Sequence, residues 1–225
     1  MLRAILFDFD GVIADSEPLH LRMFQRVLER RGIPLTQADY YATYLGMDDK
    51  GCFSTLLNLH ERESSPEVVE ALIQEKTRDF TEVVRDHPVI FPGVTAFVGE
   101  VSRHYPLAIV SGALRHEIEM ILEAAGILEA FQTIVSAEDV AEGKPNPEGF
   151  REALDRLREI TSKPIRADEC LVIEDSLAGL EAARKAGMIC LAVTNTYPRE
   201  RLSMADRIVS TLEGCRVEDL EGMFE

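Results

Sequence analysis

Short apolar runs of strand length recur along the chain, at residues 5–7, 106–110, 132–135, 169–173 and 189–193. Amphipathic stretches with helical spacing separate the last four of these runs. Strands that alternate with helices in this way are typical of parallel βαβ units. The pattern therefore predicts an α/β fold whose parallel sheet carries helices on both faces, with a further edge strand at residues 207–209 and a last helix at residues 217–224.

A long helical stretch interrupts this alternation after the first run. Apolar positions recur at helical spacing in four successive segments, each expected to form one helix, at residues 19–31, 37–44, 48–59 and 66–84. Pro88 and the pair Pro92-Gly93 then mark the return to the alternating pattern. We therefore expect an all-helical domain at residues 16–86, inserted into a core that residues 1–15 and 87–225 form together.

Polar side chains stand where the predicted strands end. Two aspartates follow the first run, a hydroxyl and a glycine the second, a lysine lies beyond the third, and an acid pair follows the fourth: Asp8, Asp10, Ser111, Gly112, Lys144, Glu174 and Asp175. In an open parallel sheet the ligand crevice lies at the carboxyl ends of the strands. All four groups are therefore expected to converge at one edge of the sheet.

Asp8 and Asp10 give the strongest single signal. Strand alternation puts both carboxylates on the same side of the chain, with Phe9 pointing away. Two anions in a small volume are costly unless a cation or a shared proton relieves them, so the pair indicates a divalent metal, a paired acid and base, or both. Residues that merely cap turns and helix starts are the alternative interpretation; the convergence of four strand ends favours the chemical one.

In this order the four groups resemble the motifs of the haloacid dehalogenase superfamily. The motifs are Asp8-Phe9-Asp10-Gly11-Val12, Ser111, Lys144 and Glu174-Asp175, and the resemblance spans nearly the whole chain. Residues 15–20 and 186–188 are similar to the branch of β-phosphoglucomutases and phosphoglycolate phosphatases, which has a small helical cap. The resemblance implies a Rossmann-like core, a cap domain and phosphoryl transfer, and it leaves the substrate open.

A phosphate ester resists hydrolysis because its anionic oxygens repel a nucleophile. We expect Asp8 to be the nucleophile and to form an aspartyl phosphate. Asp10 would protonate the leaving oxygen and then activate the incoming water or sugar hydroxyl. The resemblance implies that Mg²⁺ is held by the Asp8 carboxylate, the main-chain carbonyl of Asp10 and the Asp175 carboxylate. Glu174 would orient metal-bound waters, pair with Lys144, or bind the metal directly.

The oxygens of the phosphoryl group need donors and positive charge. The Ser111 hydroxyl, the main chain at Gly112 and the Lys144 ammonium are the candidates. His20 lies just after the expected hinge between core and cap, where it either couples cap closure to Asp10 or is an ordinary helix histidine. Arg115 either contacts the substrate or belongs to a solvated helix face.

The cap is expected to select the substrate. In β-phosphoglucomutases a cap loop carries a glycine flanked by basic residues, with an arginine three positions on that holds a second phosphate. This chain has Gly46, but Leu45 precedes it and Asp49 stands at the arginine position. Gly46 and Lys50 remain candidate substrate contacts, with a plain loop and helix start as the alternative. Asp49 favours hydrolysis of a monophosphate over mutase activity.

Composition excludes several other classes. The 225 residues carry 40 acidic and 24 basic side chains, for a net charge of −16, and contain no basic run that would track nucleic acid. We find no long apolar segment and no signal peptide, so we expect a cytoplasmic protein that does not bind membranes. We expect it to be a monomer or a weak homodimer. The four cysteines form no Cys-x-x-Cys pair, which favours reduced thiols over a zinc site.

The sequence therefore predicts a Mg²⁺-dependent phosphatase of a small phosphorylated metabolite. A β-phosphoglucomutase-like enzyme is the first alternative. Asp10 argues against a dehalogenase or a phosphonate hydrolase, because both depart from that second aspartate. A phosphorylated receiver-like signalling module shares the acids, hydroxyl and lysine, but the helical insertion is foreign to it. A catalytically inactive interaction protein has no support while every chemical group is present.

Overall fold

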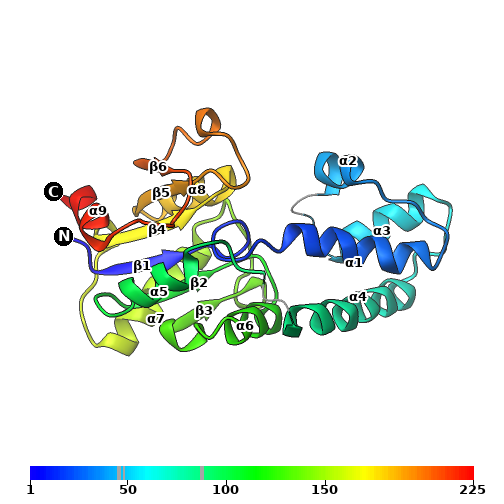
Figure 1. The fold of residues 1–225 in the computed structure, drawn as a ribbon, viewed down its shortest axis with the longest axis horizontal. Coiled ribbons are helices and arrows are strands. Elements are labelled where there is room, and N and C mark those ends of the chain that lie inside the picture. The colour runs from blue at the N-terminus through cyan, green and yellow to red at the C-terminus, as the bar shows by residue number, and fades with distance from the viewer. Residues whose placement is uncertain (45–46, 48, 87–88) are drawn as a thin grey trace. The chain divides into compact units, whose positions relative to one another are not determined.

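The computed structural model describes residues 1–44, 47, 49–86 and 89–225. The chain divides into two compact units, which Figure 1 draws in one view. The core unit consists of Met1–Asp15 together with Pro88–Glu225, and the cap unit is the continuous stretch Ser16–His87.

The core unit is built on a six-stranded parallel sheet with the order β3-β2-β1-β4-β5-β6. Its strands are β1 Ala4–Phe7, β2 Leu107–Val110, β3 Thr133–Val135, β4 Cys170–Glu174, β5 Ile189–Val193 and β6 Arg207–Val209. The predicted α/β class and the edge strand are confirmed. The first strand of the chain lies in the middle of the sheet, and the direction of winding reverses there, which is where such folds bind ligands.

Helices cover both faces of this sheet, so its inner strands are apolar on both sides. Ala4 and Leu6 of β1 belong to a buried cluster with Phe150 and Leu180, whereas Phe7 packs on the opposite face against Phe97, with ring centroids 6.1 Å apart. The helices of the core unit are α5 Val94–Val101, α6 Arg115–Ala124, α7 Glu148–Thr161, α8 Leu177–Lys185 and α9 Val217–Glu221. Short 3₁₀ turns complete it: η2 Leu128–Ala130, η3 Ala137–Asp139, η4 Ala167–Glu169, η5 Arg199–Arg201 and η6 Gly222–Phe224.

The cap unit is helical throughout its described part. It contains α1 Glu17–Glu29, α2 Gln37–Asp39, the π-helical turn η1 Tyr40–Tyr44, α3 Asp49–Leu59 and α4 Pro66–Asp86. The apolar sides of α1, α3 and α4 meet in a core that includes Phe24, Phe53 and Leu72. The expected single helix at residues 37–44 is wrong in detail: a three-residue helix capped by Thr36 passes into the π-helical turn, where Tyr40 and Tyr44 are both buried.

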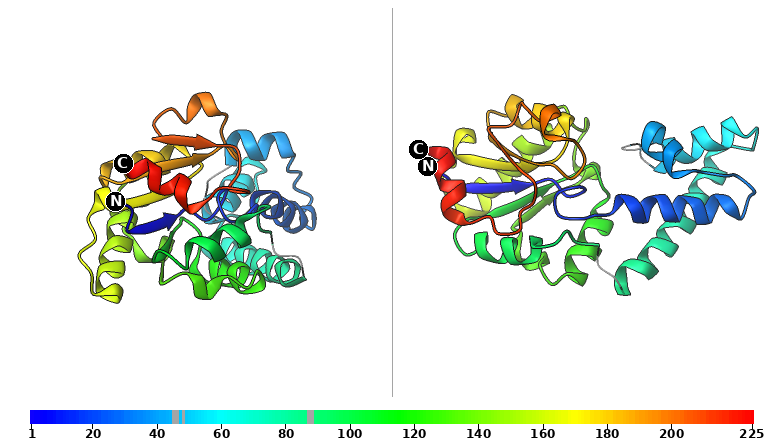
Figure 2. Two further views of the ribbon diagram at one scale, coloured as in Figure 1. Left: turned by 60° about the vertical axis from the view of Figure 1, so that its left-hand side comes forward. Right: turned by 45° about the horizontal axis from the view of Figure 1, so that its top comes forward.

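The direction of the strands fixes which edge of the sheet holds the site. Figures 1 and 2 show the two termini side by side, close to α9, at the end of the core unit where β1 begins. Because all six strands are parallel, their carboxyl ends lie at the opposite edge. In the part of the chain that the structure describes, no helix is both long and apolar enough to cross a membrane.

Candidate active site

The register of the sheet brings the predicted strand-end residues to one level. Phe7 pairs with Ile109 of β2 and with Ile173 of β4. Asp8 therefore leaves β1 beside Glu174, the last residue of β4, and its N–H donates to the Ile173 carbonyl at 2.9 Å. Ser111 directly follows β2, and its N–H donates to Val135 at the end of β3.

Lys144 joins two of these acids. Its Nζ lies 2.5 Å from Asp8 Oδ1 and 2.7 Å from Glu174 Oε1. The three side chains are largely or wholly buried, so both contacts are charge-assisted hydrogen bonds in a low-dielectric setting. Burial lowers the pKa of Lys144, but the charges of Asp8 and Glu174 outweigh it and raise that pKa overall, which keeps the lysine charged.

Hydrogen bonds to both carboxylate oxygens hold Glu174 in place. Oε1 accepts from Lys144, while Oε2 accepts from the Asp175 N–H, the Ser176 N–H and the Ser176 hydroxyl at 2.8, 2.8 and 2.9 Å. The carboxylate lies against α8 so closely that a Cβ placed on Gly179 would stand 1.6 Å from Oε1. Glu174 is therefore a buried anchor for Lys144 at the start of α8.

Asp175 is also buried, and its Oδ2 accepts a hydrogen bond from the Thr196 hydroxyl. Gly11 approaches the same oxygen: a Cβ on this residue would stand 1.9 Å from Oδ2, and its φ of +83° is one that glycine adopts freely. Burial and the negative charge of Glu174 raise the pKa of Asp175 to about 7. Burial raises the pKa of Asp8 well above its usual range, although the charge of Lys144 opposes this shift.

The acids form a site that fits a divalent cation. Carboxylate oxygens of Asp8, Glu174 and Asp175 lie within 4.8 Å of one another. Three buried acids face one lysine, so the cluster carries an excess of negative charge that a divalent ion would offset. Hard oxygen donors are those that Mg²⁺ prefers. Because Glu174 already accepts four hydrogen bonds, Asp8 and Asp175 have the more available oxygens.

Asp10 and Ser111 lie next to this cluster. The chain turns tightly after β1, with Gly11 N–H donating to Ala14 at 2.9 Å, and the charge of Asp10 acts on Asp175. The buried Ser111 hydroxyl accepts from the Ala113 N–H at 3.0 Å, which leaves its own hydrogen for an acceptor. Gly112, which stands between Ser111 and Ala113 in the chain, is exposed.

Arg115 lies in a different network. Its Nη2 donates to Asp139 at 2.8 Å and to the Ile134 carbonyl at 2.9 Å, and Arg156 donates to the same two partners. Asp139 also accepts from the N–H and hydroxyl of Ser136, and these bonds together with the two arginines hold its pKa below its usual range although burial opposes the shift. The guanidinium of Arg115 thus ties the end of β3 to η3, ahead of the loop that leads to Lys144.

The cap unit contains its own polar cluster, formed by the buried Lys76 and the half-buried His20 and Asp49. Lys76 Nζ lies 2.6 Å from Asp49 Oδ1 and 3.0 Å from His20 Nδ1, and its side chain is only 1% exposed. Burial, and then the charge of Lys76, hold the pKa of His20 well below its usual range, so this histidine is neutral and accepts from the lysine. Lys50 is exposed at the start of α3, and Gly46 lies outside the described residues.

Sequence reasoning missed Lys76, Asp139, Asn195 and Thr196. Lys76 carries a signal, because it continues the buried stripe of α4 between Leu72 and Phe80 at a spacing of four. Asn195 and Thr196 follow the fifth strand directly, so the strand-end argument applies to them as it does to the other groups. Asp139 has no comparable signal in the sequence.

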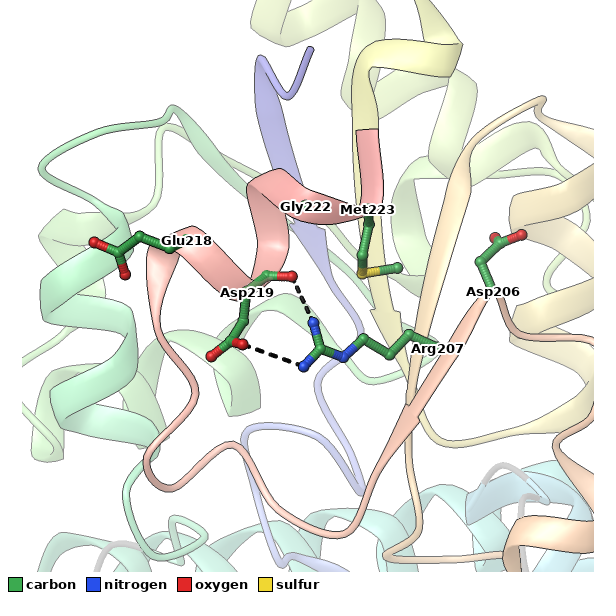
Figure 3. A pocket seen from close by; sticks show the side chains of 6 residues that line it. All are labelled: Asp206, Arg207, Glu218, Asp219, Gly222 and Met223. Atoms are coloured by element: carbon green, nitrogen blue, oxygen red, sulfur yellow. Dashed lines mark hydrogen bonds and ion pairs between the residues drawn. The ribbon is translucent and has the colours of Figure 1, made fainter. Parts of the chain in front are cut away.

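The core unit also has a hollow of about 420 Å³ beside β6 and α9 (Figure 3). Arg207 donates there to the main-chain carbonyl and to the side chain of Asp219, at 2.6 and 3.3 Å. The hollow lies where β6 begins, at the edge of the sheet opposite the carboxyl ends, so it is separate from the acidic cluster.

The fold and the acidic cluster are those of an α/β enzyme with a candidate site at the carboxyl edge of its parallel sheet. The chain belongs to the haloacid dehalogenase-like hydrolase family, which it matches over residues 5–193. The resemblance found in the motifs is thereby confirmed, and the protein is a hydrolase of this family.

The relatives include phosphatases. The chain is 30% identical over 188 residues to the phosphorylated carbohydrates phosphatase of Thermotoga maritima, an alignment that covers 83% of this chain and 82% of that protein. The structure of CbbY from Rhodobacter sphaeroides in complex with phosphate has a TM-score of 0.84 and 26% identity, and the match covers 98% of this chain and 100% of that one. A mutant of CbbY has been solved with xylulose 1,5-bisphosphate, with a TM-score of 0.81, 26% identity and coverage of 95% and 96% of the two chains.

Proposed function

We propose that the protein is a Mg²⁺-dependent phosphatase that hydrolyses a small phosphate monoester, such as a sugar phosphate or a phosphoglycolate-like molecule. The observation that carries this proposal is the contact between Asp8 and Lys144 at 2.5 Å, beside Glu174 and Asp175, where the central strand ends. A carboxylate that is paired with a cation, beside other acids that can hold a metal ion, is suited to attack a phosphorus atom.

The reaction proceeds in two displacements at the same phosphorus. An oxygen of Asp8 forms a bond to phosphorus, the bond to the ester oxygen breaks, and Asp10 gives that leaving oxygen its proton. Asp10 then takes a proton from water as the water oxygen attacks. The bond between phosphorus and Asp8 breaks, which releases inorganic phosphate and restores the carboxylate.

Positive charge and donors stabilise the transferring group. The half-buried Lys144 contacts the nucleophile directly, and it steadies both Asp8 and the phosphoryl oxygens. The Ser111 hydroxyl retains a hydrogen to donate, and the exposed main chain at Gly112 allows close approach. Lys144 is itself kept in place by the buried Glu174.

A bound Mg²⁺ supplies further positive charge for the phosphoryl oxygens. Asp8, Asp175 and the main-chain carbonyl of Asp10 would hold the ion. This assignment is supported by the clustered oxygens of the acids and by their unbalanced negative charge.

The cap unit favours a substrate with one phosphate. Asp49 balances the charge of Lys76, and His20 is neutral, so the cluster has no net positive charge to offer a second phosphate. We expect it to be suited to uncharged hydroxyl groups instead. A bisphosphate, as in the CbbY complex, or a phosphomutase reaction is the alternative, and the exposed Lys50 is the residue that would favour either.

We place this activity in the cytoplasm, on a metabolite of small size. The enzyme is expected to act as a monomer or a weak homodimer, without nucleic-acid or membrane partners, in keeping with its net charge of −16.

The test is phosphate release from a panel of sugar phosphates, phosphoglycolate and nucleotides, with and without Mg²⁺. Asp8→Asn keeps the size of the side chain and removes the nucleophile, so we expect a loss on the order of 10⁴-fold or more. Asp168→Asn, at an exposed acid next to β4, is the matched control and should retain full activity. Release that is independent of Asp8 would contradict the proposal. Interconversion of glucose 1-phosphate and glucose 6-phosphate without net release would identify the mutase.

A further inference from the structure

Thr196 lies outside the four motifs and yet contacts the acid at the centre of the candidate metal site. It follows β5 by three residues, and its hydroxyl donates to Asp175 Oδ2. The side chain of Asp175 is buried, whereas Thr196 itself is exposed at the surface. The hydroxyl is therefore not held there by apolar packing of its own, and it bonds to the Asp175 carboxylate.

Gly11 completes the environment of the same oxygen. A Cβ on Gly11 would stand 1.9 Å from Asp175 Oδ2 and 3.0 Å from Thr196 Oγ1, so the turn after Asp10, the carboxylate and the hydroxyl pack together. Asn195, the neighbour of Thr196, donates from Nδ2 to the Gly11 carbonyl at 2.7 Å. One short segment after β5 thus contacts both the first and the fourth motif.

Because of these contacts, the two carboxylate oxygens of Asp175 have different surroundings. Oδ2 is enclosed by Gly11 and the Thr196 hydroxyl. Oδ1 is then the oxygen that remains for a cation shared with Asp8. A hydrogen bond to one carboxylate oxygen also fixes the rotation of the group, which orients the other oxygen.

We propose that Thr196 is a positioning residue that orients Asp175 for a divalent cation, and that Asn195 supports it by fixing the turn at Gly11. This inference rests on the proposed function, because it takes the cation to be Mg²⁺. Thr196 acts through Asp175 and is not itself a ligand.

The experiment is calorimetric titration of the purified protein with MgCl₂ in the absence of substrate. Mutation of a residue that hydrogen-bonds to a metal ligand typically costs about 10- to 100-fold in metal affinity. Thr196→Val should therefore raise the dissociation constant for Mg²⁺ by roughly 10- to 100-fold. Thr196→Ser keeps the hydroxyl and should recover most of the affinity. Thr196→Ala, which also lacks the hydroxyl, should behave like Thr196→Val, and Asn195→Ala should weaken binding in the same direction.

Thr194→Val is the matched control, since Thr194 lies on the same segment and its main-chain N–H, which the substitution keeps, donates to Val209. Because Thr196 is exposed, the thermal midpoint of Thr196→Val in EDTA should stay within about 2 °C of the wild-type value, which a mainly structural role would not allow.

Wild-type affinity in Thr196→Val or Thr196→Ala would overturn the role of Thr196, and wild-type affinity in Asn195→Ala would overturn that of Asn195. Equal losses in Thr196→Ser and Thr196→Val would overturn the role of the hydroxyl. Absence of saturable Mg²⁺ binding by the wild-type protein would instead remove the magnesium from the proposed function, and this inference with it.

Discussion

Gly179 occupies a helix position where two physical effects oppose each other. In α8, replacing glycine by alanine improves helix propensity, which stabilises a helix interior by at most about 1 kcal/mol. At the same position, however, a Cβ would stand 1.6 Å from Glu174 Oε1, 1.9 Å from Cδ and 2.4 Å from Oε2. The carboxylate would have to retreat by more than an ångström to make room.

The movement of the Glu174 carboxylate decides whether Gly179→Ala stabilises or destabilises the protein. Glu174 accepts hydrogen bonds from Lys144, from two main-chain N–H groups and from the Ser176 hydroxyl. Hydrogen bonds to a charged group are worth about 1.5–3 kcal/mol each, so losing two of the four costs about 3–6 kcal/mol. After the gain in propensity is subtracted, we expect Gly179→Ala to lower the free energy of unfolding by about 2–5 kcal/mol.

The assay is urea unfolding followed by far-ultraviolet circular dichroism, since the chain contains no tryptophan. Gly99→Ala is the control, because Gly99 lies in α5 and, among the described residues, no atom beyond its own stretch of helix lies within 4 Å of its would-be Cβ. This variant should be more stable than the wild type by about 0.5–1 kcal/mol. If Gly179→Ala proves as stable as Gly99→Ala, the argument that Glu174 is locked against α8 is wrong.

Two further predictions concern half-buried acids that pair with basic side chains. Asp139→Asn should destabilise the core unit by about 1–3 kcal/mol at neutral pH, because Asp139 accepts charge-assisted bonds from two arginines. The pKa of Asp139 is lowered in the folded state, so its contribution is present above the unfolded pKa and is lost as the pH falls through the folded value. The difference between variant and wild type in urea midpoint should therefore shrink below about pH 4, and a constant difference would contradict this reasoning. Asp49→Ala leaves the buried Lys76 without its carboxylate partner and should destabilise the cap unit by about 1–3 kcal/mol. This is less than the loss expected for a fully buried ion pair, because Asp49 is partly exposed. Hydrogen exchange should accelerate at the amides of α4 and not at those of β1, whereas uniform acceleration would count against a local role.

The sequence was sufficient to predict the sheet and the residues at its carboxyl edge. Buried parallel strands read as apolar runs, which is why their positions were predictable. The order of the strands in the sheet comes from the structure alone. The contact between Asp8 and Lys144 joins residues 136 positions apart. It was predictable in outline because Asp8 follows one strand of the parallel sheet and Lys144 lies in the loop that follows another. Roles at the site stay predictions until they are tested.

Residues whose importance depends on tertiary partners were not predictable in this way. Lys76 reads as an ordinary charged helix residue until Asp49, 27 residues away, is known to face it. Arg115 was left open between a substrate contact and a solvated face, and the structure instead shows it bonded to Asp139, 24 residues away. Such pairs are set by how helices and loops pack, which local periodicity does not encode.

The position of β1 also bears on the order in which the molecule is assembled. Both neighbours of this strand come late in the chain, β2 about a hundred residues later and β4 later still. On a ribosome the candidate nucleophile Asp8 is thus made well before Glu174, its companion on Lys144. The cap unit is a single continuous stretch, so its contacts are available long before the central sheet is complete. Synthesis therefore makes the contacts within the cap unit available before those that complete the candidate site.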